Sequence, residues 1–288
     1  MRASTLRAAG MVTLVVAALL GSAYALGRSL MPDHPRGNGV AASVRAPHYG
    51  DQPPSTDFPG PPGGGYGGPS PDPSPSGPDS GRQADDSEGP YGAEVSTGSA
   101  RIALTFDDGP DPQWTPQVLA LLKEYGVKAT FCVVGENAEA HPDLVRSIVA
   151  DGHTICNHSW NHDLALGKRS ADAIRDDLTR TNDAIRAAAP DARIAYFRQP
   201  GGAWTSPVVS VCEELGMTPL HWAVDPTDWQ VPGAAKITQV VLAQTRPGSI
   251  VLMHDAGGDR SGTVEALQDL LPQLMHRFQL EALPTGTT

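Results

Sequence analysis

The residues from about 100 onward predict a parallel α/β fold with helices covering both faces of the sheet. Short apolar runs, which suit buried strands, alternate there with longer amphipathic stretches of helical spacing. This strand–helix unit repeats about seven times, and strands that alternate with helices pair in parallel. Polar side chains directly follow the predicted strands, where parallel α/β proteins carry their functional groups. About seven units fit a closed or nearly closed barrel better than an open sheet, but periodicity alone is compatible with both.

The apolar runs give the strands. The first run, RIALTF, predicts a buried strand, and the later runs have the same short apolar character. In chain order, strands are expected at residues 101–106, 128–134, 153–156, 195–197, 217–222 and 249–253.

The amphipathic stretches between these runs predict helices. The first, residues 114–125, has one apolar face and a glycine at its end, as shown by Val118, Leu119, Leu122, Tyr125 and Gly126. Further helices are expected at residues 142–150 (with proline in the first turn), 171–189, 207–215, 234–245 and 263–278.

The residues before this region are expected to lie outside the folded domain. Residues 1–27 have an arginine-containing start, an apolar run and the small-x-small sequence AYA, which is the pattern of a secretory signal. The apolar run is marginal in length for a membrane span, so a cleaved signal and a retained anchor both stay open. Residues 28–98 are rich in proline and glycine, which predicts a disordered linker. The folded domain is then expected at residues 99–288, secreted or membrane-anchored and outside the cytoplasm.

Charge and cysteine content limit the partners of the chain. The 21 Lys+Arg and 32 Asp+Glu give a net charge of −11, and the sequence contains no basic block, so we expect no nucleic-acid partner. The cysteines are Cys132, Cys156 and Cys212. An odd number leaves at least one without a partner in the chain, and we expect all three to be small buried apolar side chains. A Cys132–Cys156 disulfide stays open if their strands are neighbours. No oligomerisation signal is visible, so we expect a monomer.

Many of the polar residues that follow the predicted strands are carboxylates and imidazoles. Because the carboxyl ends of parallel strands meet at one rim, we expect these side chains to gather there. They are Asp107, Asp108, His158, His162, Arg198, Pro200, Asp225, Asp228, Trp229, His254 and Asp255.

His158 and His162 form the clearest metal-binding pattern in this group. Two histidines four residues apart share one face of a helical turn and can bind one ion. Ser159 stands where the HExxH proteases have glutamate, so the base must come from elsewhere. Asp107 and Asp108 can supply a third ligand and a free base, since a carboxylate bound to a cation is a poor base. Alone, this acidic pair followed by Gly-Pro would also fit a simple turn.

The ordered set of motifs resembles the polysaccharide deacetylases of the NodB-homology type, carbohydrate esterase family 4. The resemblance covers residues 99 to about 280. Its motifs are TFDDG at 105–109, HSWNH at 158–162, RQPGG at 198–202, DPTDW at 225–229 and LMH at 252–254. The resemblance implies a distorted (β/α) barrel and makes residues 99–288 the catalytic domain.

The resemblance also implies roles for the polar residues. Asp107 would be the general base, held by a charge-assisted pair with Arg198. His254 would be the general acid, and Asp228 would raise its pKa so that it stays protonated near neutral pH. A divalent metal ion, zinc or cobalt in this family, would be bound by Asp108, His158 and His162.

The substrate-binding residues implied by the resemblance are Pro200, Gly201, Trp229 and Leu252. Trp229 and Leu252 would wall the pocket for the acetyl methyl group, and the backbone N–H of Gly201 would face the oxyanion. Gly201 departs from the family pattern, because many relatives have a bulky side chain there. We expect a wider groove as a result, unless Trp204 fills the space.

Together these features predict an enzyme that removes N-acetyl groups from β-1,4-linked N-acetylglucosamine polymers, either peptidoglycan or chitin oligosaccharides. One alternative is O-deacetylation of acetylxylan with the same residues, a reaction that depends less on an acid at His254. A second is a carbohydrate-binding module without activity, although no motif residue is lost. A third is a hydrolase of small cyclic amides, which the secretion pattern disfavours.

Overall fold

The computed structural model describes residues 88–285 and contains a parallel sheet of six strands in the order β5-β4-β3-β2-β1-β6. The expectations for residues 1–27, and for 28–98 as far as residue 87, lie outside the described residues. The strands are β1 (Ala103–Asp107), β2 (Thr130–Val133), β3 (Thr154–Asn157), β4 (Ile194–Phe197), β5 (Thr218–Pro219) and β6 (Ile250–His254). The expected (β/α) class is confirmed, and every pair of neighbouring strands is parallel.

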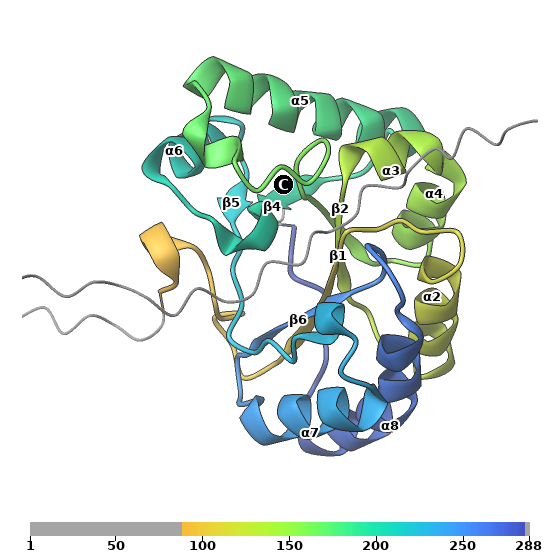
Figure 1. Ribbon diagram of the computed structural model, residues 1–288. Helices are drawn as coiled ribbons and strands as arrows, with labels where there is room; N and C mark the ends of the chain where they lie inside the picture. The colour runs from red at the N-terminus through yellow and green to blue at the C-terminus, as the bar shows by residue number, and fades with distance from the viewer. Residues whose placement is uncertain (1–87, 286–288) are drawn as a thin grey trace, which may run out of the picture. The chain divides into compact units, whose positions relative to one another are not determined.

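Helices connect the strands, as the periodicity predicts. They are α2 (Thr115–Glu124), α3 (Gly135–Ala140), α4 (Pro142–Ala150), α5 (Ala171–Ala188), α6 (Ser206–Glu214), α7 (Ala234–Gln244) and α8 (Ser261–Arg277). The short 3-10 turns are η1 (Pro90–Gly92), η2 (Leu166–Lys168), η3 (Pro200–Gly202) and η4 (Asp228–Gln230). Helices α7 and α8 pack side by side beyond β6, and α5 lies on α3 (Figure 1). Within residues 88–285, no helix combines the length and apolar character needed to cross a membrane.

The two faces of the sheet carry separate cores, because side chains alternate along a strand. Leu104 and Phe106 of β1 belong to the large core beneath the helices, whereas Ala103 belongs to a smaller core on the other face. The smaller core consists of Ala103, Cys132, Cys156, Tyr196, Leu220, Ile250 and Leu283. A sheet with apolar side chains on both faces is the arrangement of a curled (β/α) barrel.

The chain after β5 supplies the position of a seventh strand. Only Thr218–Pro219 of the expected strand 217–222 pairs with β4, and Leu220 then bridges to Glu94. The chain continues to the free edge of β6, where Val224 and Val251 form a parallel bridge. In place of the expected seven or so strands, the described residues form six strands, with the isolated Val224–Val251 bridge at the seventh position.

Ordered structure begins before the expected boundary at residue 99. Glu94 bridges Leu220, Ser96 bridges Ser249, and Ala93 is fully buried. These residues lie between β5 and the start of β6, where their backbone groups find partners in the sheet. The expectation of a disordered linker is therefore wrong for residues 88–98.

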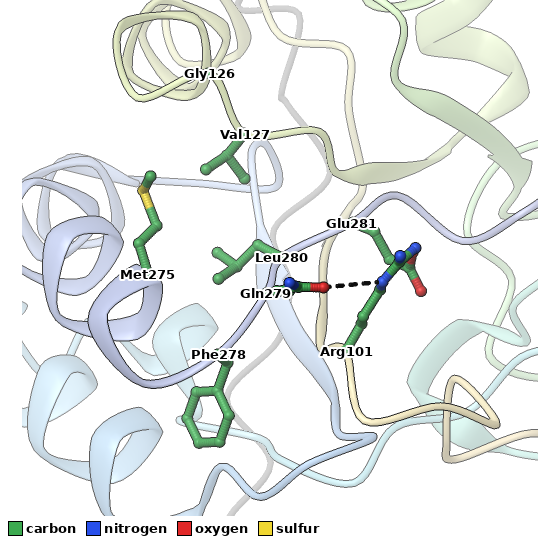
Figure 2. A pocket seen from close by; sticks show the side chains of 8 residues that line it. All are labelled: Arg101, Gly126, Val127, Met275, Phe278, Gln279, Leu280 and Glu281. Atoms are coloured by element: carbon green, nitrogen blue, oxygen red, sulfur yellow. Dashed lines mark hydrogen bonds and ion pairs between the residues drawn. The ribbon is translucent and has the colours of Figure 1, made fainter.

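The last described residues cross the amino-terminal ends of the strands. Leu280 bridges Ile102, and the N–H of Leu283 donates to Thr130 Oγ1 at the start of β2. A shallow apolar pocket beside this tail is drawn in Figure 2, which also shows the hydrogen bond from Arg101 to Gln279. The residues lining the pocket are Arg101, Gly126, Val127, Met275, Phe278, Gln279, Leu280 and Glu281. None of them belongs to the motifs above.

The structure corrects the expectation for the cysteines. Cys132 and Cys156 face each other in the register of β2 and β3, and they form a disulfide. Only Cys212, on the buried face of α6, has the free apolar character expected for all three. Strand pairing decides this outcome, because register places both Cβ atoms on the same face of the sheet.

Candidate active site

The functional side chains come from the carboxyl ends of four strands, as expected. Asp107 ends β1, His254 ends β6, and these two residues are direct partners in the register of the sheet. His158 follows β3 and Arg198 follows β4. Parallel pairing alone therefore brings two acids, two imidazoles and a guanidinium to one rim. One of the two acids is Asp108, which follows Asp107 directly. His162 lies further along the loop after β3.

Asp108, His158 and His162 form a possible metal site. Their ligand atoms lie within 4.8 Å of one another, and Asp108 Oδ1 is 3.5 Å from His158 Nε2 and 3.3 Å from His162 Nε2. Asp108 Oδ1 is buried and has no hydrogen-bond partner among the described residues. A buried carboxylate oxygen normally has a hydrogen-bond partner. A divalent cation bound between this oxygen and the two imidazole nitrogens would supply the missing partner.

The protonation of the histidines also suits ligation. His158 Nδ1 is 2.7 Å from the carbonyl oxygen of Arg198, which requires the proton on Nδ1 and leaves Nε2 towards Asp108. Burial and the neighbouring His158 lower the pKa of His162 to about 4, so its imidazole is neutral at physiological pH. Burial lowers the pKa of His158, but the neighbouring Asp107 and Asp108 carboxylates raise it above the ordinary value. A cation bound at the site would lower it again, because its charge disfavours a protonated imidazole.

The expected helical turn between the two histidines is wrong. Residues 158–162 form a loop in which Ser159 and His162 have positive φ angles of 64° and 55°. Asp108 also has a positive φ of 75°. Non-glycine residues adopt this region rarely, and such backbone strain concentrates at functional sites. The ligands converge through loop geometry rather than through helical spacing.

Arg198 holds Asp107, as the resemblance implies. The fully buried guanidinium donates through Nη1 to Asp107 Oδ1 at 2.6 Å and to Thr105 Oγ1 at 2.9 Å. Its Nη2 donates to the carbonyl of His221 at 3.0 Å. Asp107 Oδ2 lies 3.6 Å from His158 Nε2, beside the metal site. The buried guanidinium holds Oδ1 of Asp107 and leaves Oδ2 directed towards the rim.

His254 and Asp228 form the second pair at the rim. His254 Nδ1 is 2.7 Å from Asp228 Oδ1, and the backbone N–H of His254 donates to Asp228 Oδ2 at 2.9 Å. Burial alone would lower the pKa of His254, but the charge and hydrogen bond of Asp228, with Asp108 and Asp107 nearby, raise it to about 9. An imidazolium with this pKa can donate a proton at neutral pH.

The four residues expected to bind substrate differ in exposure. Pro200 is buried in η3, and Leu252 is buried in β6. Gly201 has a φ of 60°, and a Cβ there would lie 2.8 Å from Leu164 Cδ2, so Leu164 occupies the space beside it. Trp229 is 51% exposed, so a large part of its side chain is open to solvent.

Trp204 does not fill the space at Gly201. It is buried, packs edge-on against Phe197 and donates from Nε1 to His221 Nδ1. Core packing therefore explains this tryptophan, and the apolar neighbour of Gly201 is Leu164.

Asp255 lies at the rim, as expected; it is fully buried, accepts a hydrogen bond from Thr115 Oγ1 at 2.5 Å, and has its pKa raised to about 7 by burial. Several other residues around the site were not found from the sequence. A Cβ at Gly257 would lie 2.4 Å from Asp108 Oδ2, so this glycine packs against the possible metal ligand. Arg260 and Thr263, at the start of α8, both contact Asp228. These residues contact the motif residues only through tertiary packing.

A (β/α) barrel with a carboxylate–histidine metal site and a separate buried acid–base set at its rim defines a hydrolytic enzyme of the metal-dependent class. Comparison with known proteins gives the family. A profile described as polysaccharide deacetylase matches residues 94–220. The chain is 43% identical over 201 residues to a chitooligosaccharide deacetylase of Sinorhizobium fredii, covering 65% of this chain and 92% of that protein.

Further relatives agree with this match. The chain is 39% identical over 183 residues to a peptidoglycan-N-acetylglucosamine deacetylase of Bacillus cereus, covering 63% of this chain and 84% of that protein. It resembles the crystal structure of a peptidoglycan N-acetylglucosamine deacetylase with a TM-score of 0.63 at 37% identity, covering 66% of this chain and 90% of that one. The protein belongs to the polysaccharide deacetylase family, as the motifs predict.

Proposed function

We propose that the protein removes N-acetyl groups from β-1,4-linked N-acetylglucosamine polymers or oligomers, with peptidoglycan and chitin oligosaccharides as the candidate substrates. The observation that carries this proposal is the presence, at one rim, of a carboxylate held by Arg198, an imidazole held by Asp228 and a separate ligand set. The relatives described above are named as deacetylases of chitooligosaccharides and of peptidoglycan, which supports the substrate class.

Asp108, His158 and His162 would hold a divalent ion. Neutral imidazoles with a carboxylate suit zinc, and cobalt takes the same ligands. When bound, the ion supplies Lewis acidity towards the attacking water and the acetyl carbonyl. With three protein ligands, the site would leave the ion open to a further ligand.

Asp107 acts as the general base. Arg198 occupies its Oδ1, so Oδ2 faces the rim and takes a proton from water while the water oxygen bonds to the acetyl carbon. The charge-assisted pair with the Arg198 guanidinium fixes the orientation of the Asp107 carboxylate. The two neighbouring carboxylates therefore have different roles: Asp107 transfers the proton, and Asp108 would bind the ion.

His254 completes the reaction as the general acid. Its Nδ1–H donates to Asp228, so its Nε2–H is the proton available to the leaving nitrogen. Protonation of this nitrogen lets the C–N bond break, which yields acetate and a free amine on the sugar. With its pKa raised to about 9, His254 carries the proton that the leaving nitrogen requires at neutral pH.

Substrate contacts follow from the residues around this set. We propose that the backbone N–H of Gly201 faces the oxyanion and that Pro200 and Leu252 shape the acetyl site. Trp229, exposed beside Asp228, offers an apolar face to a sugar ring.

We also propose that the chain works outside the cytoplasm as a monomer, secreted or anchored through its N-terminus. Residues 1–27 have the signal pattern, and residues 28–87 have the linker composition. The Cys132–Cys156 disulfide supports an oxidising compartment. Fusion to a reporter that is active only outside the cytoplasm tests this placement, and a fusion that is expressed but shows no reporter activity would refute it.

Acetate release by the purified chain tests the activity. Chitopentaose, peptidoglycan and acetylated xylan are compared after chelation, with and without added zinc or cobalt, beside Asp107→Asn. We expect metal-restored release from the amino-sugar substrates and its loss in the variant. Release from xylan alone would favour the O-deacetylase, and no release with metal bound would favour a carbohydrate-binding module.

A further inference from the structure

The turn that carries Asp228 has an unfavourable backbone at both ends. Thr227 and Val231, which flank η4, have φ angles of 53° and 54°. Both are β-branched, and such residues seldom adopt the left-handed region, because their side chains crowd the backbone there. A turn of this kind keeps its shape only when surrounding contacts hold it.

Arg260 supplies one of these contacts. This residue immediately precedes α8, and it is 2% exposed. Its Nη1 donates to the carbonyl of Asp228 at 2.9 Å, while Nε donates to Ala256 at 2.7 Å and Nη2 to Gly257 at 3.1 Å. One rigid, planar group therefore ties η4 to the loop that follows β6 and His254.

Thr263 holds the side chain of the same aspartate. It is 1% exposed, and its Oγ1 donates to Asp228 Oδ2 at 2.8 Å. Oδ2 also accepts the backbone N–H of His254, which leaves Oδ1 for the His254 ring. The hydroxyl thus fixes the rotation of the carboxylate that orients the imidazole.

We propose that Arg260 and Thr263 are positioning residues for the general acid, acting through Asp228 on His254. This inference rests on the proposed function, because it requires His254 to protonate the leaving nitrogen. Arg260 fixes the backbone of Asp228 and Thr263 fixes its carboxylate. Both residues come from the start of α8, outside the motifs that carry the chemistry.

The leaving group provides a readout specific to the acid. An amine must be protonated to leave, whereas 4-nitrophenolate leaves without an acid. The ratio of kcat for chitopentaose to kcat for 4-nitrophenyl acetate therefore reports how well His254 is positioned. A loss of folded protein alone would lower both rates together and leave the ratio unchanged.

Thr263→Val removes the hydroxyl and keeps the shape of the side chain. We expect it to lower kcat for chitopentaose by about tenfold, with kcat for 4-nitrophenyl acetate and both KM values within about twofold. Thr263→Ser keeps the hydroxyl and should retain the wild-type ratio. Arg260→Met should also lower the ratio. If Arg260→Met does not fold, Thr263→Val alone tests the inference.

Matched controls separate the outcomes. Leu270→Val alters the buried face of α8 away from Asp228 and should leave the ratio unchanged. Asp228→Asn and His254→Ala must lower the ratio; if neither does, the acid assignment is wrong and this inference falls with it. If both lower the ratio but Thr263→Val does not, the positioning inference alone is overturned. Combining Thr263→Val with Asp228→Asn should add little to the single Asp228→Asn effect, and full additivity would also overturn it.

Discussion

Replacing Asp228 with asparagine should move the alkaline limit of activity to lower pH. Burial lowers the pKa of His254, but the charge and hydrogen bond of Asp228 raise it to about 9. Relative to an ordinary histidine near 6.5, the folded protein favours the protonated ring by about 3 kcal/mol. Because the folded-state pKa is the raised one, this stabilisation is complete below about pH 6.5 and is lost as pH rises through about 9.

The size of the effect follows from the fraction of His254 that carries its proton. At pH 8 a group with a pKa of about 9 is about 90% protonated, whereas one near 6.5 is about 3% protonated. Asparagine keeps an acceptor for His254 Nδ1 but has no charge, so burial then acts against protonation. Activity at pH 8 should fall by at least about 30-fold, and by much less at pH 5.5.

The assay is kcat/KM for acetate release from chitopentaose between pH 5 and 10. Asp225→Asn is the matched control, because Asp225 lies on the same loop but accepts its hydrogen bond from the N–H of Thr227. Its alkaline limit should shift much less than that of Asp228→Asn, because Asp225 acts on His254 through charge alone, without a hydrogen bond to the ring. An alkaline limit in Asp228→Asn equal to the wild type would refute the assignment of His254 as an acid tuned by Asp228.

Three further changes test the metal site, the disulfide and the tail. Gly257→Ala places a Cβ 2.4 Å from Asp108 Oδ2 at a positive φ, so zinc affinity measured by calorimetry should fall at least about tenfold; unchanged affinity would contradict the ligand role of Asp108. Replacing Cys132 and Cys156 with serine opens a link of sequence separation 24 and should lower the free energy of unfolding in urea by about 3 kcal/mol. A loss below about 0.5 kcal/mol would count against the disulfide. Ending the chain after Phe278 removes the tail from the smaller core and should cost more than about 2 kcal/mol in the same assay, and an unchanged urea midpoint would show that the tail does not hold that core.

The order of strands and helices could be predicted because it depends on local patterns. Helix α4 begins and ends where proline and apolar spacing place it, and the other predicted helices differ from the structure by one or two residues at their ends. Helix α3 was missed because its sequence, GENAEA, has no apolar stripe. The strand expected at 217–222 is shortened because Leu220 pairs with Glu94, a residue assigned to the linker on composition alone.

The candidate site was predictable wherever strand ends determine it. Asp107 and His254 meet because their strands pair, which follows from the fold class. The loop from His158 to His162 has positive φ angles that no spacing rule contains. Strand register forms the disulfide, and a helix distant in sequence brings Arg260 to Asp228. These contacts depend on tertiary packing, which residue patterns in one sequence do not encode locally.

The pairing of β1 with β6 and the tail beneath the strands have a consequence for folding. Ile250 lies opposite Ala103 in the register, and Leu283 bonds to Thr130, so the first strands take their last partners from the end of the chain. Contacts between residues so far apart in sequence form slowly, since a long loop must close first. While the chain is being made, β1 has an open edge, and the smaller core lacks two of its members. The catalytic rim, which uses both β1 and β6, can therefore assemble only after the residues of β6 have been synthesised.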